Sequence, residues 1–331
     1  MTPTLLLFLY LILGLILIVV GANFLVDGSS FIARKFKISE FVVGLTIVGM
    51  GTSTPELVVS MISGIQGSGD IAIGNVVGSN IANIFLILGM TALISPIGFT
   101  KTNIKLDLPI CIATSVLLLL LSFDTLFFGQ DANVIGRIDS IILLLGFIAF
   151  MIYSFKVSGN ESEAADSEDV ISSSGDKPSK YPILKAVVKI VAGLAGLILG
   201  GRLFVDSGSE MAAGFGVSEA FIGITVMAVG TSLPELAASV VAAMKKKGQM
   251  ALGNIVGSNI FNILFILGTC SMVTPLTLGG ITLVDVLVMI AAPVFILFAA
   301  FTPKKRVMDR WEGLLFLIIY LVYIVYLTKN L

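Results

Sequence analysis

Two short motifs place a glutamate in the middle of apolar sequence. GLTIVGMGTSTPEL (Gly44–Leu57) carries Glu56, and GITVMAVGTSLPEL (Gly223–Leu236) carries Glu235. An ionised carboxylate inside an apolar membrane span costs about 3 kcal/mol, so it needs a partner. No Lys or Arg lies within ten residues of either motif inside its own apolar stretch, which leaves a bound cation, or a proton when the site is empty. A protonated glutamate bonded between helices is the alternative, but two equivalent occurrences favour a cation site.

Oxygen donors surround both glutamates in the sequence. Threonine, serine and proline precede each one, at Thr52, Ser53 and Pro55 and again at Thr231, Ser232 and Pro234. Proline cannot donate a backbone hydrogen bond, so it frees the carbonyl four residues earlier, which belongs to Gly51 or Gly230. Carbonyls, hydroxyls and a carboxylate form an all-oxygen shell of the kind that Ca²⁺ and Na⁺ prefer, whereas soft metals prefer Cys or His. We therefore expect a site for a hard cation.

A second pair of motifs adds amide side chains. GNVVGSNIANIFLILG (Gly74–Gly89) matches GNIVGSNIFNILFILG (Gly253–Gly268). Residues four apart share one face of a helix, so Ser79 and Asn83, and likewise Ser258 and Asn262, are candidate ligands. Asn80 and Asn259 point about 100° away from the serines and are weaker candidates. The glycines of these motifs form small-xxx-small faces that favour close helix packing.

The motifs belong to an internal duplication. Both pairs are offset by 179 residues, with identity at 8 of 14 positions in the first pair and 12 of 16 in the second. Each copy holds five apolar segments, an odd number, so the second copy must enter the membrane from the opposite side. The predicted architecture is an inverted repeat with the site near the bilayer midplane. It divides the chain into a first repeat (1–155), a flexible linker (156–182) and a second repeat (183–331).

Composition requires a membrane protein. Of 331 residues, 56% are hydrophobic and 12% charged, and the mean hydropathy is +1.06. A span needs about 20 apolar residues, and the apolar runs lack the alternation of barrel strands. We predict an all-α polytopic protein with ten helices, at 4–30, 41–65, 71–95, 104–123, 133–155, 183–212, 220–244, 249–273, 280–300 and 311–328. The chain has no histidine, which excludes histidine triads and zinc sites.

The distribution of basic residues predicts the orientation. With the N-terminus outside, 17 of the 20 Lys and Arg residues lie in or beside the inner loops. Both termini are then external, and the acidic, Ser-rich linker is cytoplasmic. Two cysteines, in apolar runs, are interpreted as packing residues. We expect the protein to be integral to the cell membrane.

GTSTPEL with GNVVGSNIAN, and GTSLPEL with GNIVGSNIFN, together resemble the two alpha repeats of the Ca²⁺/cation antiporter superfamily, most closely its prokaryotic sodium/calcium exchanger branch. The resemblance covers nearly the whole chain and implies exchange of Ca²⁺ for Na⁺ by alternating access. It implies that Glu56 and Glu235 bind both ions. Backbone carbonyls would come from Thr52, Thr231, Gly49 and Ala228; Ser53, Ser79, Ser232 and Ser258 would line flanking Na⁺ sites, with Asn83 and Asn262 at the centre. No cofactor, nucleic acid or protein partner is expected.

Several alternatives stay open at this point. Some relatives carry Asp where this chain has Asn262, and that Asp is associated with potassium dependence, so a potassium-dependent exchanger is disfavoured. An H⁺/Ca²⁺ exchanger usually has another acidic motif with a nearby histidine, which this chain lacks. A channel fits two broken-helix motifs less well than a transporter does. An intramembrane hydrolase has no recognisable catalytic pattern here, so we expect no enzyme activity.

Overall fold

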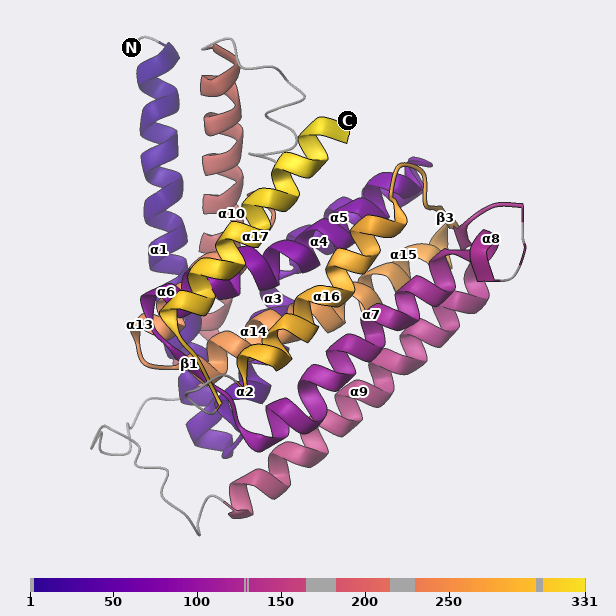
Figure 1. Cartoon of the computed structure of the whole chain (residues 1–331). Helices are drawn as coiled ribbons and strands as arrows, with labels where there is room; N and C mark the ends of the chain where they lie inside the picture. Colours follow the sequence, from indigo (N-terminus) through magenta and orange to yellow (C-terminus); the bar gives the residue numbers. More distant parts are fainter. Residues whose placement is uncertain are drawn as a thin grey trace.

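The computed structural model describes residues 3–127, 129, 131–164, 183–214, 230–301 and 306–330, and in this part the protein is almost entirely helical (Figure 1). The helices of the first half are α1 (Pro3–Phe36), α2 (Glu40–Val43), η1 (Gly44–Val48), α3 (Gly49–Thr52), α4 (Thr54–Ile65), α5 (Gly69–Ile81), η2 (Ala82–Leu88), α6 (Gly89–Ile94), η3 (Asn103–Asp107), α7 (Leu108–Ser122), α8 (Asp124–Phe127) and α9 (Arg137–Ala164). Those of the second half are α10 (Ile183–Gly214), α13 (Leu233–Met244), α14 (Gly248–Phe261), η5 (Asn262–Leu267), α15 (Gly268–Val273), α16 (Leu283–Ala299) and α17 (Arg310–Asn330).

Seven helices of the described chain are long and apolar enough to cross a membrane, and an eighth span results if one bent pair is counted together. The bent pair joins Glu40–Thr52 to Thr54–Ile65 at an angle of 45°. Two further apolar helices, Leu233–Met244 and Leu283–Ala299, are shorter than 18 residues. Thus the all-helical membrane fold is confirmed, whereas this count does not reach the ten spans expected from the sequence.

The bend falls where proline begins a new helix. Ser53 leaves the helical conformation, with φ −79° and ψ 10°, and Pro55 lies in the first turn of α4. Ser232, with φ −88° and ψ 5°, precedes α13 in the same way, with Pro234 in its first turn. Proline is tolerated in the first turn because the N–H groups there have no partner within the helix. Each motif glutamate therefore lies in the first turn after a break.

Wide helical turns accompany the motifs. The π-helical segments η1, η2 and η5 interrupt the α-helices inside the motif regions, and η2 and η5 begin at or one residue before the second-motif asparagines Asn83 and Asn262. Such turns occur mostly as short insertions in α-helices, often at functional sites.

Glycines let the two halves approach at backbone distance. A Cβ added to Gly253 of α14 would lie 2.1 Å from the carbonyl oxygen of Phe41, and one on Gly257 would lie 2.5 Å from that of Leu45. The α1 and α10 helices, which run side by side in Figure 1, meet in the same manner, since a Cβ on Gly21 would lie 2.7 Å from the oxygen of Gly193. The small-residue faces predicted for α14 are thus packing faces against the other half.

Two short antiparallel ladders also join the halves. Strand β1 (Ile97–Gly98) pairs with β4 (Val307–Met308), and β2 (Val134–Ile135) pairs with β3 (Leu276–Thr277). In both ladders one strand comes from each half of the chain.

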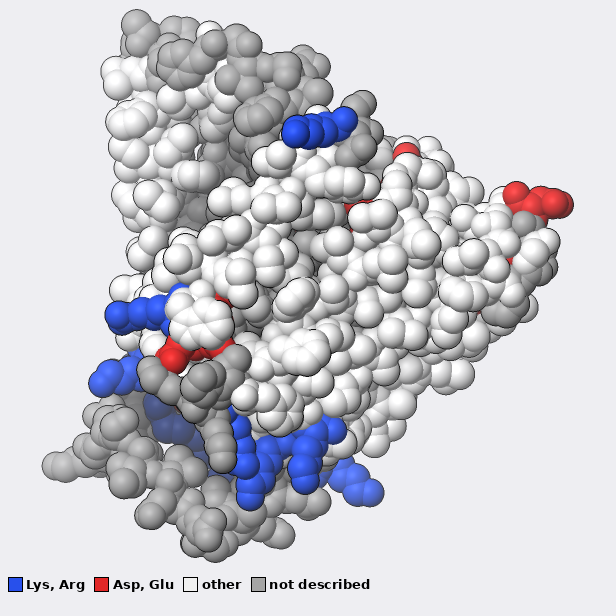
Figure 2. Space-filling view, in the orientation of Figure 1, with Lys and Arg blue, Asp and Glu red and all other residues white. Residues whose placement is uncertain are grey.

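Charged side chains lie mostly at the ends of the molecule. Figure 2 shows Lys and Arg gathered at one end, over the last turns of α1 and the beginning of α7, with a wide uncharged belt beside them. Helix α9 continues to Ala164, nine residues beyond the predicted end of the first repeat, so the linker is helical at its start. The rest of the predicted linker, 165–182, lies outside the described residues.

Candidate functional site: a buried pair of carboxylates between the two halves

The two motif glutamates lie together in the interior and are each held by the other half. Glu56 and Glu235 are both 1% exposed. The hydroxyl of Ser53 donates a hydrogen bond to Oε1 of Glu235 at 2.9 Å, and that of Ser232 donates to Oε1 of Glu56 at 3.4 Å. Each helix break therefore places its serine on the carboxylate of the opposite motif. The reciprocal pattern brings two carboxylates into one site.

Four buried oxygens at this site have no hydrogen-bond donor in the described part of the chain. They are Oε2 of Glu56, Oε2 of Glu235, Oδ1 of Asn83 and Oδ1 of Asn262. Helix α4, which carries Glu56, contacts η5, which begins at Asn262, and α13, which carries Glu235, contacts η2, which contains Asn83. Buried polar atoms are almost always paired, so four unpaired acceptors on neighbouring elements are matched by a bound cation, or by protons or water when the site is empty.

The donor set suits a hard cation. Two carboxylate and two amide oxygens are the ligand types that Ca²⁺ and Na⁺ accept. Among the described residues, no three His, Cys, Asp or Glu side chains come together. In that part of the chain, the negative charge of the site thus comes from the two glutamates, and the other ligands named here are neutral.

Threonine and glycine of the first motif lie directly beside the second motif of the other half. The hydroxyl of Thr52 lies 3.2 Å from Oδ1 of Asn254 and also contacts the carbonyls of Val48 and Gly49. The carbonyl of Gly49 also accepts a hydrogen bond from the hydroxyl of Ser258, at 3.3 Å. Both predicted ligands from this turn, Thr52 and Gly49, therefore lie at the interface between the halves.

Three further residues of the first motif and its repeat have different outcomes. The buried hydroxyl of Thr231 lies beside the carboxylate of Glu56 and interacts with it. Ala228 lies outside the described residues, so its predicted role as a carbonyl ligand stays a prediction. The carbonyl of Gly51, expected to be freed by Pro55, instead accepts from the hydroxyl of Thr54 at 2.8 Å.

Four residues that support the glutamates were missed in the sequence. The amide of Asn75 donates to the backbone carbonyl of Glu56 at 3.2 Å and to the hydroxyl of Ser60 at 3.0 Å. Asn254 repeats this with the carbonyl of Glu235 at 3.3 Å and the hydroxyl of Ser239 at 2.8 Å. The signal was available, because both asparagines follow the first glycine of the duplicated GN-x-VGSN motif.

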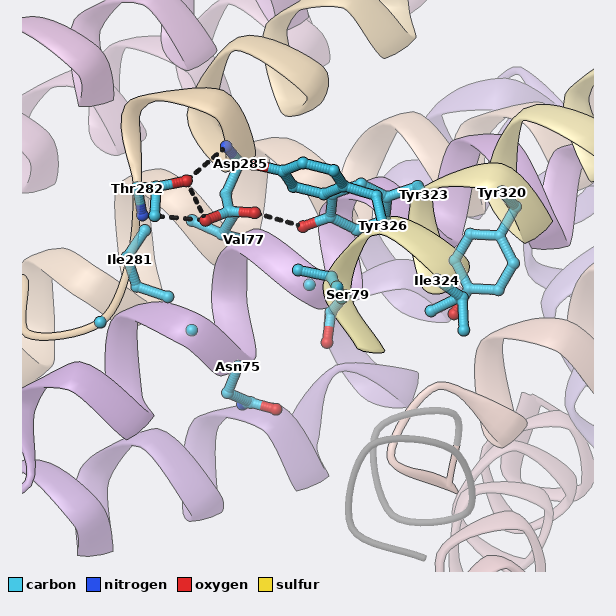
Figure 3. Close-up of a pocket in the computed structure, with 14 residues that line it drawn as sticks. Asn75, Val77, Ser79, Ile281, Thr282, Asp285, Tyr320, Tyr323, Ile324 and Tyr326 are labelled. Atoms are coloured by element: carbon cyan, nitrogen blue, oxygen red, sulfur yellow. Dashed lines mark hydrogen bonds between the residues drawn. The ribbon is translucent and has the colours of Figure 1, made fainter. Parts of the chain in front are cut away.

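Ser79 lies on the wall of a neighbouring cavity. This cavity, of about 330 Å³, is bounded by α5, the loop before α16, and α17 (Figure 3). On its far side Oδ2 of Asp285 accepts hydrogen bonds from the backbone N–H and hydroxyl of Thr282, and Oδ1 accepts from the hydroxyl of Tyr323 at 2.9 Å. Ser79 therefore borders this cavity, as does Asn75, which also supports Glu56; the predicted role of Ser79 at a Na⁺ site stays a prediction.

Comparison with known proteins identifies the family. The model of the sodium/calcium exchanger protein family matches residues 6–156 and 185–329. The chain is 36% identical over 344 residues to the sodium/calcium exchanger MaX1 of Methanosarcina acetivorans, covering 97% of this chain and 98% of the relative. It is 33% identical over 265 residues to the inner membrane protein YrbG of Escherichia coli K12, covering 80% and 79%.

A solved structure shows the same fold. The sodium–calcium exchanger NCX_Mj, soaked with zero Na⁺ and Ca²⁺, superposes with a TM-score of 0.80 at 33% identity, covering 98% of this chain and 99% of that one. The family match extends over both halves, and both contribute a glutamate to the buried site. This chain belongs to the sodium/calcium exchanger family.

Proposed function

We propose that the protein exchanges Ca²⁺ for Na⁺ across the cell membrane by alternating access. The observation that carries this proposal is the group of four buried, unpartnered oxygens on Glu56, Glu235, Asn83 and Asn262. A divalent cation neutralises two carboxylates, and Na⁺ accepts the same oxygen ligands. Serine, threonine and carbonyl oxygens beside them supply neutral positions for additional Na⁺.

The same donor set predicts that transport moves net charge. Positions 83 and 262 are both Asn, so within the described residues the site holds two acids, Glu56 and Glu235. If more than two Na⁺ replace one Ca²⁺, the Na⁺-loaded carrier is the more positive one. An inside-negative potential then drives Na⁺ inward and Ca²⁺ outward, worth about 2.3 kcal/mol per net charge per 100 mV. The proposed direction is Ca²⁺ extrusion.

The architecture we propose is two inverted repeats of five spans. The bent pair and α16 bring the seven long apolar helices to nine, and the tenth is the span expected from the sequence at 220–244, of which the structure describes α13. Two reciprocal patterns support this arrangement. Strand β1 pairs with β4 while β2 pairs with β3, and the serine of each motif donates to the glutamate of the other. The basic end of the molecule in Figure 2 is then cytoplasmic, with both termini external.

Reconstituted protein tests the function. Proteoliposomes loaded with Na⁺ should take up ⁴⁵Ca²⁺, and uptake should stop when the Na⁺ gradient is removed. Parallel vesicles with K⁺ or H⁺ gradients test the alternatives; Asn262 in place of Asp disfavours a role for K⁺, and the absence of histidine disfavours a role for H⁺. Calcium flux that proceeds without any counter-ion would show a channel and refute the proposal.

A further inference from the structure

The asparagines Asn80 and Asn259 form a bridge between the two halves, directly beside the ion site. Both are buried, at 1% and 2% exposure, and they occupy equivalent positions in the duplicated motif. The amide nitrogen of Asn80 donates to the backbone carbonyl of Asn259 at 3.1 Å, and that of Asn259 donates to the carbonyl of Asn80 at 3.3 Å. Each side chain also accepts one hydrogen bond from the opposite half.

Those accepted hydrogen bonds come from the two asparagines at the ion site. The amide nitrogen of Asn262 donates to Oδ1 of Asn80 at 3.0 Å, and that of Asn83 donates to Oδ1 of Asn259 at 2.9 Å. The four amides thus form a closed arrangement with approximate two-fold symmetry. Its outer members have both amide ends occupied, whereas the oxygens of the inner members, Asn83 and Asn262, accept no hydrogen bond from the part of the chain that the structure describes.

Hydrogen-bond logic fixes which end of each amide faces the ion site. A backbone carbonyl can only accept, so the end of Asn80 that faces the carbonyl of Asn259 must be its NH₂ group. Oδ1 of Asn80 then faces Asn262, so Asn262 must donate a hydrogen bond to it from its own NH₂ group. The oxygen of Asn262 is left pointing away from the bridge, and the same reasoning applies to Asn259 and Asn83.

We propose that Asn80 and Asn259 are positioning residues that hold the amides of Asn262 and Asn83 with their oxygens toward the transported cation. This inference rests on the proposed function and adds two residues that act only through their neighbours. Without the bridge, an amide beside the site can rotate and present NH₂ hydrogens to a cation, which repels it. Partners that orient a metal ligand typically change metal affinity by about 10–100-fold.

A carboxylate at position 262 supplies the test, because its two oxygens are equivalent and need no orientation. In the otherwise native protein, Asn80→Ala should raise the KM for Ca²⁺ by about 10-fold or more. In an Asn262→Asp background the same Asn80→Ala change should not raise the KM, because a carboxylate at position 262 cannot donate to Oδ1 of Asn80 and does not depend on that bond, which gives a double-mutant coupling. A purely structural role for Asn80 would cost the same in both backgrounds.

Two measurements keep the outcome clear. Na⁺-dependent ⁴⁵Ca²⁺ uptake gives the KM, and the rise in the unfolding temperature on adding Ca²⁺ to purified protein reports binding without transport. The equivalent cycle, Asn259→Ala with Asn83→Asp, serves if the first variant does not fold. An equal loss in both backgrounds, or an unchanged Ca²⁺ response in Asn80→Ala, would overturn the proposal. If the native protein binds Ca²⁺ but its flux ignores Na⁺, the proposed function fails while the positioning role is still tested by binding.

Discussion

Replacing Glu56 by Gln removes one of the two charges that hold the cation and disturbs little else. Oε1 of Glu56 accepts from Ser232 at 3.4 Å, and Gln keeps an oxygen for that bond. Oε2 has no donor among the described residues, so no protein hydrogen bond is lost there. The substitution is isosteric, and the fold should be retained.

The size of the effect follows from the burial of the pair. Removing one partner of a buried charge pair costs about 3–5 kcal/mol, and Glu56 is 1% exposed with a divalent ion as its partner. Every 1.4 kcal/mol is about tenfold, so Ca²⁺ affinity should fall by roughly two to three and a half orders of magnitude. Transport at micromolar Ca²⁺ should then disappear, and the unfolding temperature without Ca²⁺ should be unchanged or higher.

The assay is Na⁺-dependent ⁴⁵Ca²⁺ uptake, with thermal unfolding of the purified variants in parallel. Glu312→Gln is the matched control, because Glu312 is 2% exposed and its Oε2 accepts from the backbone N–H of Asp309, away from the site. That variant should transport with the native KM. Native KM values in both Glu56→Gln and Glu235→Gln would refute the assignment of the site.

Three further outcomes are expected. Gly253→Ala should destabilise the protein by about 1–3 kcal/mol, because its Cβ would lie 2.1 Å from the carbonyl oxygen of Phe41. The measurement is a lower unfolding temperature. Gly248→Ala on the same helix is the control and should leave the unfolding temperature unchanged, since its Cβ would have no described atom within 4 Å. A cysteine introduced at Lys246 should be labelled only from the cytoplasm, and one introduced at Gly129 only from outside. Both native cysteines are buried, so they should add no background labelling. Labelling from the opposite sides would reverse the proposed orientation. Na⁺-driven Ca²⁺ flux should follow a potential clamped with K⁺ and valinomycin, checked with a second ionophore, and flux indifferent to voltage would mean electroneutral exchange.

Most of the candidate site could be predicted from the sequence, because the duplication repeats the same residues at equivalent positions. Glu56 and Glu235 stand out as acids in apolar runs at equivalent positions, and the all-helical membrane fold follows from composition. The breaks at Ser53 and Ser232 follow from the adjoining prolines. These features depend on local residue type and spacing, which one sequence contains.

What the sequence did not show depends on contacts between the halves. Helical periodicity places Asn80 and Asn259 on a different face from the serines, which makes them weak candidates as ion ligands. The structure shows that this face contacts the opposite half of the chain. The carbonyl of Gly51 was expected to be free, but a threonine hydroxyl next to the proline occupies it. The sequence predicts a span at 280–300, where the structure has α16, a helix of 17 residues.

The strand ladders described above suggest how the two halves would behave as separate molecules. Each ladder takes one strand from residues 1–155 and one from residues 183–331, and the glycine contacts and the paired serine–glutamate bonds also cross between those segments. These contacts, all between described residues, join the halves independently of the covalent connection at 156–182. Two polypeptides ending and beginning in that connection, produced in the same cell, should find each other and complement into an active carrier, whereas either alone would present unpaired strand edges and half an ion site. In this respect the two halves resemble the subunits of a heterodimer that happen to be covalently linked.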